Sequence, residues 1–390
     1  MPARRTVLRE AALLGAGLAA GAPFLSAASR AGVPRAIAPY TAACVQTRVR
    51  PTWSSSGAPL PEALAANVET VARAIERTAG ESGAKLLVFS EFCLQMPLVR
   101  LAPEQWEAGA VDLSGPEIAR LRAAAQRAGA YLVLNPVEAI AAFPGRYFLT
   151  GLLLSPSGET ALTYRKLYDL TGKTRPSDVL PQWRELYGED PLFPVADTPL
   201  GRIGLTVGTD ANWPEMVRSL ALRGAEVVAT CLASPNVTPS SPAKRAPDAP
   251  DANDPALPVM ARRLRAYENM AYMLTANLGP VGEADGNPLG DMQPSEIVDY
   301  HGNVLAASPD AGARAITATL DIEAQRRARC TPGPANALLQ LQSGLHAPDY
   351  AAARFDAPPA PGENHAQAQR RRIRDLVARG VLAAPASGLP

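Results

Sequence analysis

Three segments place polar residues where enzymes commonly hold an acid, a cation and a nucleophile. Glu91 closes an apolar run, LLVFSEF, and Lys166 closes a predicted β-hairpin. Residues 203–215 read IGLTVGTDANWPE, an apolar strand followed by a tight turn and the start of a helix. A strand-to-helix turn exposes its side chain beside free backbone N–H groups, and it often carries a nucleophile. The tip of this turn is Gly208, which raises the question of whether a reactive atom has been lost.

Alternating strand and helix patterns surround these three segments. Strands are predicted over residues 41–49, 85–92, 130–137, 148–155, 160–166, 202–207, 226–232, 275–278, 296–299, 304–306 and 315–320. Helices are predicted for the segment with Leu64, Val68, Val71 and Ile75 on one face, and over residues 117–129, 214–223, 260–273 and 366–379. Residues 167–200 and 234–259 read as long loops. The alternation predicts a layered α/β domain, and the hairpins make its sheets mixed.

Composition and net charge limit the classes of partner and cofactor that the chain is expected to have. The chain has 390 residues, 47% hydrophobic and 19% charged, which is typical of a globular protein with a large core. A net charge of +1 gives no reason to expect a nucleic acid or an anionic membrane as partner. Neither the three histidines nor the four cysteines have metal-ligand or redox-motif spacing, so no metal and no cofactor is expected.

The N-terminal residues resemble an export signal. ARRTVLR, residues 3–9, precedes an uncharged run of small and apolar residues over 11–29. This pattern, with its paired arginines, predicts a twin-arginine signal peptide over residues 1–30 and a periplasmic or secreted mature protein; the alternative is a basic tail. We expect one catalytic-type domain over residues 38–330 and no membrane association after signal removal. A Pro- and Ala-rich tail with a basic segment follows over residues 331–390.

Six stretches, in order, resemble the nitrilase superfamily of carbon–nitrogen hydrolases. They read ACVQTRV, LLVFSEF, LSPSGETALTYRKL, GRIGLTVGTDANWPEMVRSLALRGAEVVA, RAYENMAYMLTAN and SEIVDYHGNVLA, and they cover roughly residues 40–325. The N-carbamoyl amino acid amidohydrolase and aliphatic amidase branches are the most similar. The resemblance implies a four-layer α-β-β-α sandwich, a homodimer or higher homo-oligomer, and a small amide or carbamoyl compound as ligand.

The resemblance also assigns roles to residues. In this family a cysteine attacks an amide, carbamoyl or nitrile carbon, a glutamate takes the thiol proton, and a lysine stabilises the oxyanion. Glu91 would be the general base and Lys166 the cation. The nineteen-residue step after Lys166 makes Glu185 the second carboxylate, with Glu189 as its rival.

The chain departs from the family pattern at the nucleophile. The usual motif places a cysteine where this chain has Gly208, followed here by Thr209 and the retained acid Asp210. With Trp213, these residues are predicted to line the substrate site. The hairpin strand also lacks the asparagine often found before the lysine and reads YFLTG instead.

Several alternatives for the chemistry remain open. Cys231 and Cys93 follow strands near the predicted site, and Thr209 adjoins the glycine, so each could replace the nucleophile, although buried thiols are usually inert. Direct hydrolysis is another route, with Glu91 activating water in room left by Gly208. The sequence therefore predicts an exported amidase-like or N-carbamoyl amidohydrolase-like protein, or a noncatalytic relative that binds a small ligand or a partner.

Overall fold

The computed structural model describes residues 36–168, 174–189, 192–235, 256–283, 287–353, 355, 359–360 and 363–389. The predicted signal peptide over residues 1–30 lies outside these residues, as does most of the predicted loop 234–259. Among the helices of the described part, none is both long and apolar enough to cross a bilayer.

The first sheet has seven strands and carries Glu91 and Lys166 after two of them. Its strands are β1 (Tyr40–Gln46), β2 (Leu86–Phe89), β3 (Tyr131–Leu134), β4 (Val137–Glu138), β5 (Phe148–Leu154), β6 (Thr160–Arg165) and β13 (Arg314–Leu320). Their order is β13-β1-β2-β3-β5-β4, with β6 paired to β5. Strands β1, β2 and β3 are parallel, and the other pairs are antiparallel.

The second sheet has six strands, and Gly208 directly follows one of them. Its strands are β7 (Val195–Thr198), β8 (Gly201–Val207), β9 (Val227–Cys231), β10 (Tyr272–Ala276), β11 (Glu296–Val298) and β12 (Val304–Ala307). The order is β12-β11-β10-β9-β8-β7, parallel only from β8 to β10. Both sheets are mixed, as the hairpin patterns predicted.

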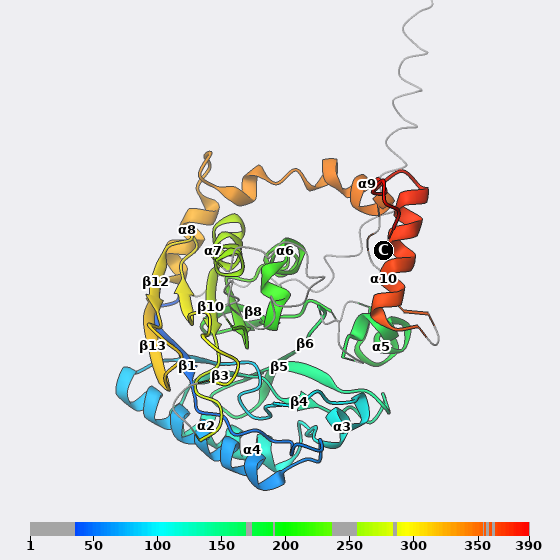
Figure 1. The fold of residues 1–390 in the computed structure, drawn as a ribbon. Coiled ribbons are helices and arrows are strands. Elements are labelled where there is room, and N and C mark those ends of the chain that lie inside the picture. Colours follow the sequence, from blue (N-terminus) through cyan, green and yellow to red (C-terminus); the bar gives the residue numbers. More distant parts are fainter. Residues whose placement is uncertain are drawn as a thin grey trace, which may run out of the picture. The chain divides into compact units, whose positions relative to one another are not determined.

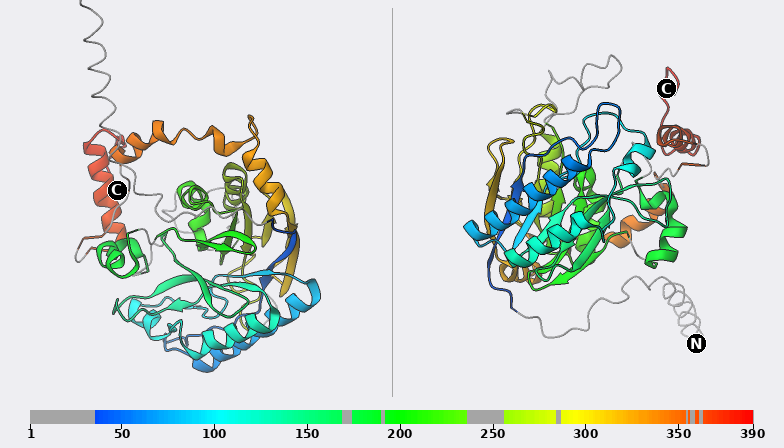
Figure 2. Two further views of the ribbon diagram at one scale, coloured as in Figure 1. Left: turned by 180° about the vertical axis from the view of Figure 1, so that it is seen from behind. Right: turned by 90° about the horizontal axis from the view of Figure 1, so that it is seen from below.

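Helices cover the outer face of each sheet (Figure 1). Helices α2 (Pro61–Ser82) and α4 (Pro116–Ala128) pack Val71, Ile75 and Leu121 against the first sheet. They lie side by side (Figure 2, right) and are joined by the Arg120–Glu69 and Arg127–Glu76 ion pairs. Helix α6 (Pro214–Leu222) and helix α7 (Leu257–Asn269) contribute Met216, Leu220 and Ala266 to the core on the second sheet. This is the predicted α-β-β-α layering.

Local sequence explains where these helices begin and end. Proline, which lacks the N–H that a first turn leaves unpaired, opens α2, α4 and α6 at Pro61, Pro116 and Pro214. Gly83 and Gly129 directly follow helices α2 and α4. Both adopt the left-handed conformation, which costs glycine little because it has no Cβ. The predicted helix 260–273 instead ends at Asn269, and β10 begins at Tyr272.

Sequence patterns missed several short elements. Residues 167–200, predicted as a loop, contain the 3₁₀ turn η1 (Pro176–Val179), helix α5 (Leu180–Tyr187) and strand β7. Helix α3 (Pro103–Ala108) and the short helical segment η2 (Gly208–Asn212) were also unforeseen. The last part of the chain forms α8 (Ile322–Cys330), η4 (Ala337–Gln340), α9 (Ser343–Ala353) and α10 (His365–Ala378).

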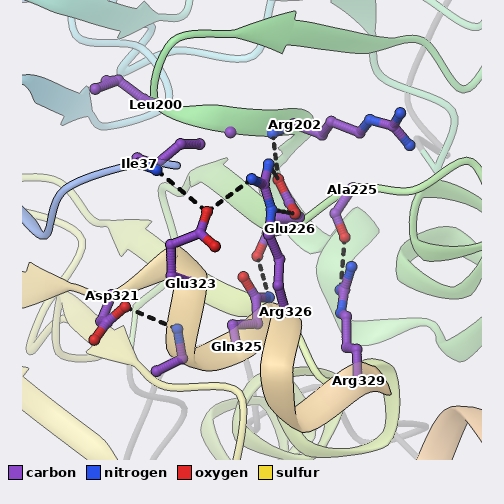
Figure 3. Close-up of polar contacts among 12 residues, drawn as sticks. Ile37, Leu200, Arg202, Ala225, Glu226, Asp321, Glu323, Gln325, Arg326 and Arg329 are labelled. Atoms are coloured by element: carbon purple, nitrogen blue, oxygen red, sulfur yellow. Dashed lines mark hydrogen bonds and ion pairs between the residues drawn. The ribbon is translucent and has the colours of Figure 1, made fainter. Parts of the chain in front are cut away.

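A buried polar cluster joins α8 to the second sheet (Figure 3). We call Glu226, Gln325, Arg326 and Arg329 the Glu226 cluster. The Arg326 guanidinium donates to the Glu226 carboxylate from Nε at 2.6 Å and Nη2 at 3.1 Å, and the Arg202 backbone N–H donates to the same carboxylate at 2.9 Å. Gln325 donates to the backbone carbonyl of Glu226, and Arg329 donates to that of Ala225. The cluster fixes α8 beside the start of β9.

Candidate functional site

The three segments singled out in the sequence converge on one pocket of about 240 Å³. Glu91 follows β2, Lys166 follows β6 and Gly208 follows β8, so strand ends from both sheets form it. Its lining is Glu91, Phe92, Trp106, Tyr147, Leu149, Lys166, Gly208, Thr209, Leu232 and Ala233. We call this cavity the Glu91–Lys166 pocket.

Glu91 and Lys166 form a buried ion pair. Lys166 Nζ donates to Glu91 Oε1 at 2.9 Å, although the two residues are 75 positions apart in the chain. The Glu91 N–H donates to the carbonyl of Leu232 at 3.2 Å, which ties the end of β2 to the end of β9. The Lys166 N–H donates to the carbonyl of Leu149 at 3.0 Å. Backbone contacts therefore fix where both charged side chains begin.

Gly208 lies directly against this ion pair. Its φ is +60°, in the left-handed region where a side chain is strained. A Cβ at this position would stand 2.6 Å from Lys166 Nζ and 2.9 Å from both Glu91 carboxylate oxygens. The ends of Lys166 and Glu91 therefore occupy the surroundings of that Cβ position, although Gly208 also lines the pocket.

Asp210 joins the turn to the segment that carries the lysine. Its Oδ2 accepts from the Tyr164 hydroxyl at 2.6 Å and from the Val207 N–H at 3.3 Å, and its Oδ1 accepts from the Tyr168 N–H at 2.9 Å. Burial raises the pKa of Asp210 to about 6. The charge of Lys166 and these hydrogen bonds act in the opposite direction but are outweighed. Asp210 does not line the pocket; it positions Lys166 by holding the residues on both sides of it.

Tyr164 is a site residue that the sequence interpretation missed. It lies two positions before Lys166, and side chains two apart on a strand share a face. That periodicity was the available signal. Burial first, and then the charge of Asp210, raise the pKa of Tyr164, so its hydroxyl stays a hydrogen-bond donor to that carboxylate.

Aromatic side chains form another part of the lining. Phe92 has a φ of +59°, rare for a residue with a side chain, and its N–H donates to Asn135 Oδ1 at 3.0 Å. Asn135 also donates to the carbonyl of Thr150, so it joins the end of β2 to β5. Trp106 stacks on Tyr147 with ring centroids 4.9 Å apart and an interplanar angle of 6°.

Three predicted side chains point elsewhere. Glu185 and its rival Glu189 are exposed and do not line the pocket, so the structure does not bring the predicted second carboxylate to the site. The reason is local: α5 buries Trp183, and Glu185 is turned away from that buried face. Trp213, predicted to contact substrate, is 49% exposed and stacks on Tyr168 outside the lining.

The two thiols considered as alternative nucleophiles are buried. Cys93 and Cys231 are buried, and neither lines the pocket. Burial raises the pKa of Cys93 to about 12 and that of Cys231 well above its ordinary value, which disfavours the reactive thiolate. Thr209 does line the pocket and is exposed. Within the described residues, no group of three or more His, Cys, Asp or Glu side chains could hold a metal ion.

Comparison with known proteins bears on the family to which the chain belongs. Residues 41–329 match the carbon–nitrogen hydrolase family model. A deaminated glutathione amidase of Yersinia enterocolitica is 27% identical over 205 residues, which is 50% of this chain and 63% of that protein. A formamidase of Pseudomonas syringae is 31% identical over 147 residues, covering 37% and 39% of the two chains. The chain thus spans less than two thirds of the length of these relatives.

Solved structures of the same fold show the same layering. The C. elegans NitFhit protein superposes with a TM-score of 0.56 at 20% identity, covering 80% of this chain and 67% of that one. A variant of the amidase from Nesterenkonia sp. AN1, carrying the acetamide moiety of fluoroacetamide on its active-site cysteine, gives 0.55 at 23% identity, covering 79% and 96%. Together with the family match over residues 41–329, this places the chain in the carbon–nitrogen hydrolase family of the nitrilase superfamily.

Proposed function

We propose that the chain recognises small linear amides or N-carbamoyl compounds in the Glu91–Lys166 pocket and lacks the cysteine route of hydrolysis. A primary amide has a carbonyl oxygen that accepts hydrogen bonds and an NH₂ group that donates them. Lys166 supplies a cationic donor and Glu91 an anionic acceptor, which are the matching groups. Charge-assisted hydrogen bonds of this kind are stronger than neutral ones, so the pair is suited to orient an amide.

The observation that carries this proposal is the position of Gly208 against the ion pair. Glu91 and Lys166, which we assign as the acid and the ammonium of the family site, face one cavity, whereas Gly208, which we assign to the position of the family cysteine, has no side chain. Both neighbouring thiols are buried outside the lining. Recognition of an amide requires only the retained pair, but the covalent step requires a nucleophile that these residues do not supply.

A second candidate function, slow hydrolysis by water, is favoured by the retained contact between Glu91 and Lys166. A carboxylate can take a proton from water, and an ammonium can stabilise the oxyanion that forms on the amide carbonyl. Without the covalent intermediate, this route would leave only the electrostatic part of the usual rate enhancement. Binding and turnover therefore have to be measured separately.

Calorimetry with acetamide and propionamide, beside an assay for released ammonia, tests both functions. We expect binding that is weakened at least tenfold in Glu91→Gln and in Lys166→Met. The matched controls Glu62→Gln and Lys85→Met change exposed residues outside the pocket and should bind as the wild type does. Ammonia release that disappears with Glu91→Gln would favour hydrolysis, whereas failure of the wild type to bind any amide would refute recognition.

We further propose that the protein is exported through the twin-arginine route. The support is the sequence alone: paired arginines at positions 4 and 5, followed by an uncharged run. In a bacterium with that transport system, we expect the wild type in the periplasm and a variant with both Arg4→Lys and Arg5→Lys in the cytoplasm. The control Arg30→Lys should not change the distribution, and equal periplasmic amounts of all three proteins would argue against export by this route.

A further inference from the structure

The lining of the Glu91–Lys166 pocket combines a few polar side chains with a larger set of apolar and aromatic ones. Glu91, Lys166 and Thr209 supply its polar side chains, beside Gly208. The remaining lining is apolar or aromatic: Phe92, Trp106, Tyr147, Leu149, Leu232 and Ala233. A ligand that fills such a pocket needs a polar head for the ion pair and an apolar body for the rest.

The aromatic side chains of the lining pack against one another. We call Phe92, Trp106 and Tyr147 the aromatic wall. Trp106 stacks on Tyr147, and its ring centroid lies 5.9 Å from that of Phe92 at an interplanar angle of 32°. Trp53 packs edge-on against Trp106 at 5.2 Å, and its ring N–H donates to the carbonyl of Gln105 at 3.0 Å. The wall is thus held before any ligand arrives.

The size of the pocket agrees with an aromatic ligand. An apolar cavity of about 150 Å³ in another protein holds benzene. The Glu91–Lys166 pocket, at about 240 Å³, has space for a ring together with a carboxamide group. Acetamide and formamide, which lack a ring, would leave the aromatic wall uncovered.

The charges of the lining disfavour an anionic ligand. Among the described residues that line the pocket, Lys166 is the one cation, and it is bonded to Glu91. The carboxylate of an N-carbamoyl amino acid would lie beside apolar side chains or compete with Glu91 for the ammonium, and a buried charge without a partner is costly. A neutral ring carries no such cost.

From these observations we infer that the pocket prefers primary carboxamides attached to an aromatic ring over short aliphatic amides and over N-carbamoyl amino acids. This inference rests on the proposed amide recognition and specifies the ligand class for the same site. The amide group contacts Glu91 and Lys166, and the ring lies against the aromatic wall. Ring burial and ring–ring contact both add to the affinity of the amide head.

Titration calorimetry with benzamide, acetamide, N-carbamoylglycine and toluene tests the inference. We expect benzamide to bind at least tenfold more tightly than acetamide, and N-carbamoylglycine more weakly than benzamide. Equal affinities for benzamide and acetamide would overturn the ring preference while leaving amide recognition intact. Absence of binding by all four ligands would overturn both. Toluene binding as tightly as benzamide would support the ring site and refute recognition of the amide group.

Two variants test whether the ring of the ligand lies in the pocket. Trp106→Leu removes the centre of the aromatic wall and should bring the affinity for benzamide within threefold of that for acetamide. Ala233→Phe adds a ring to the lining and should exclude benzamide but still admit acetamide, which keeps the test valid if Trp106→Leu folds poorly. Tyr267→Leu removes an exposed aromatic residue of α7 outside the lining and should leave every affinity unchanged. Unchanged benzamide affinity in both pocket variants would contradict the inference.

Discussion

Two buried glutamates, Glu91 and Glu226, hold basic side chains in different settings. Their exposed fractions are similar, 3% for Glu91 and 6% for Glu226. Glu226 uses both carboxylate oxygens for the Arg326 guanidinium and the Arg202 N–H, and it does not line the pocket. Glu91 contacts Lys166 and faces a cavity. Burial therefore does not distinguish a carboxylate that holds the fold together from one that can meet a ligand; the cavity and the partners do.

The largest expected effect is the loss of stability when the Glu226 cluster is broken. Glu226→Gln should lower the free energy of unfolding by about 3 kcal/mol, because it removes the buried, charged acceptor of two Arg326 donors and of the Arg202 N–H. Urea denaturation measures this, and Glu62→Gln, an exposed site, is the control. The folded fraction should still bind an amide with wild-type affinity. A loss below about 1 kcal/mol would show that Arg326 finds sufficient compensation elsewhere, for example in Glu323.

The second largest effect is the loss of amide affinity when Glu91 is changed. Glu91→Gln should weaken amide binding at least tenfold, since a hydrogen bond to a charged group contributes about 1.5–3 kcal/mol. It should lower the free energy of unfolding by only about 1 kcal/mol, because one side-chain hydrogen bond is lost and Lys166 still interacts with the charge of Asp210. Calorimetry and urea denaturation on the same preparation check both parts. A variant that unfolds as easily as Glu226→Gln yet binds amides normally would reverse the comparison.

The third effect is a dependence of stability on pH from Asp210. Its pKa in the folded chain, about 6, lies above the ordinary value of 3.8. Between these values the folded chain holds a proton that the unfolded chain releases, so this group stabilises the fold as pH falls through 6 and loses that contribution as pH rises. Lowering the pH from 7 to 5 should favour the wild type over Asp210→Asn by about 1.4 kcal/mol.

Urea denaturation of both proteins at the two pH values measures this difference directly. Groups other than Asp210 titrate in both proteins and cancel in the comparison. A difference that stays constant between pH 5 and pH 7 would mean that the pKa of Asp210 is not raised in the folded chain.

The smallest effect follows from adding a methyl group at Gly208. Gly208→Ala should cost about 1 kcal/mol of stability because its φ of +60° strains any side chain. The new Cβ would also push Lys166 and Glu91 apart, so acetamide should bind more weakly. Gly129→Ala, at a φ of +59° with open space around it, is the matched control for strain without that contact. Equal amide affinity in the two variants would show that displacing Lys166 and Glu91 does not affect amide binding.

The resemblance to the nitrilase superfamily predicted that Glu91, Lys166 and Gly208 share a site, but the contacts around them could not be predicted. Glu91 and Gly208 follow strands of different sheets, so the rule that parallel strands bring their carboxyl ends to one edge of a sheet does not by itself bring them together. Glu185 was misplaced because spacing within a loop does not say which face a short helix buries. Trp183 decides that face by packing with Phe143 and Phe148, residues far away in sequence. The bonds from α8 to Glu226 likewise join positions about 100 apart.

Intact-mass analysis after incubation with fluoroacetamide is the most direct test of the claim that the acid–ammonium pair remains without a nucleophile. With the exposed Cys330 changed to serine in every protein, the chain with Gly208 should gain no covalent adduct. Gly208→Cys should gain one that peptide mapping locates at position 208, whereas Gly208→Ala should not. An adduct on wild-type Cys93, Cys231 or Thr209, accompanied by ammonia release from acetamide, would contradict the account by showing that another residue has taken over the attack.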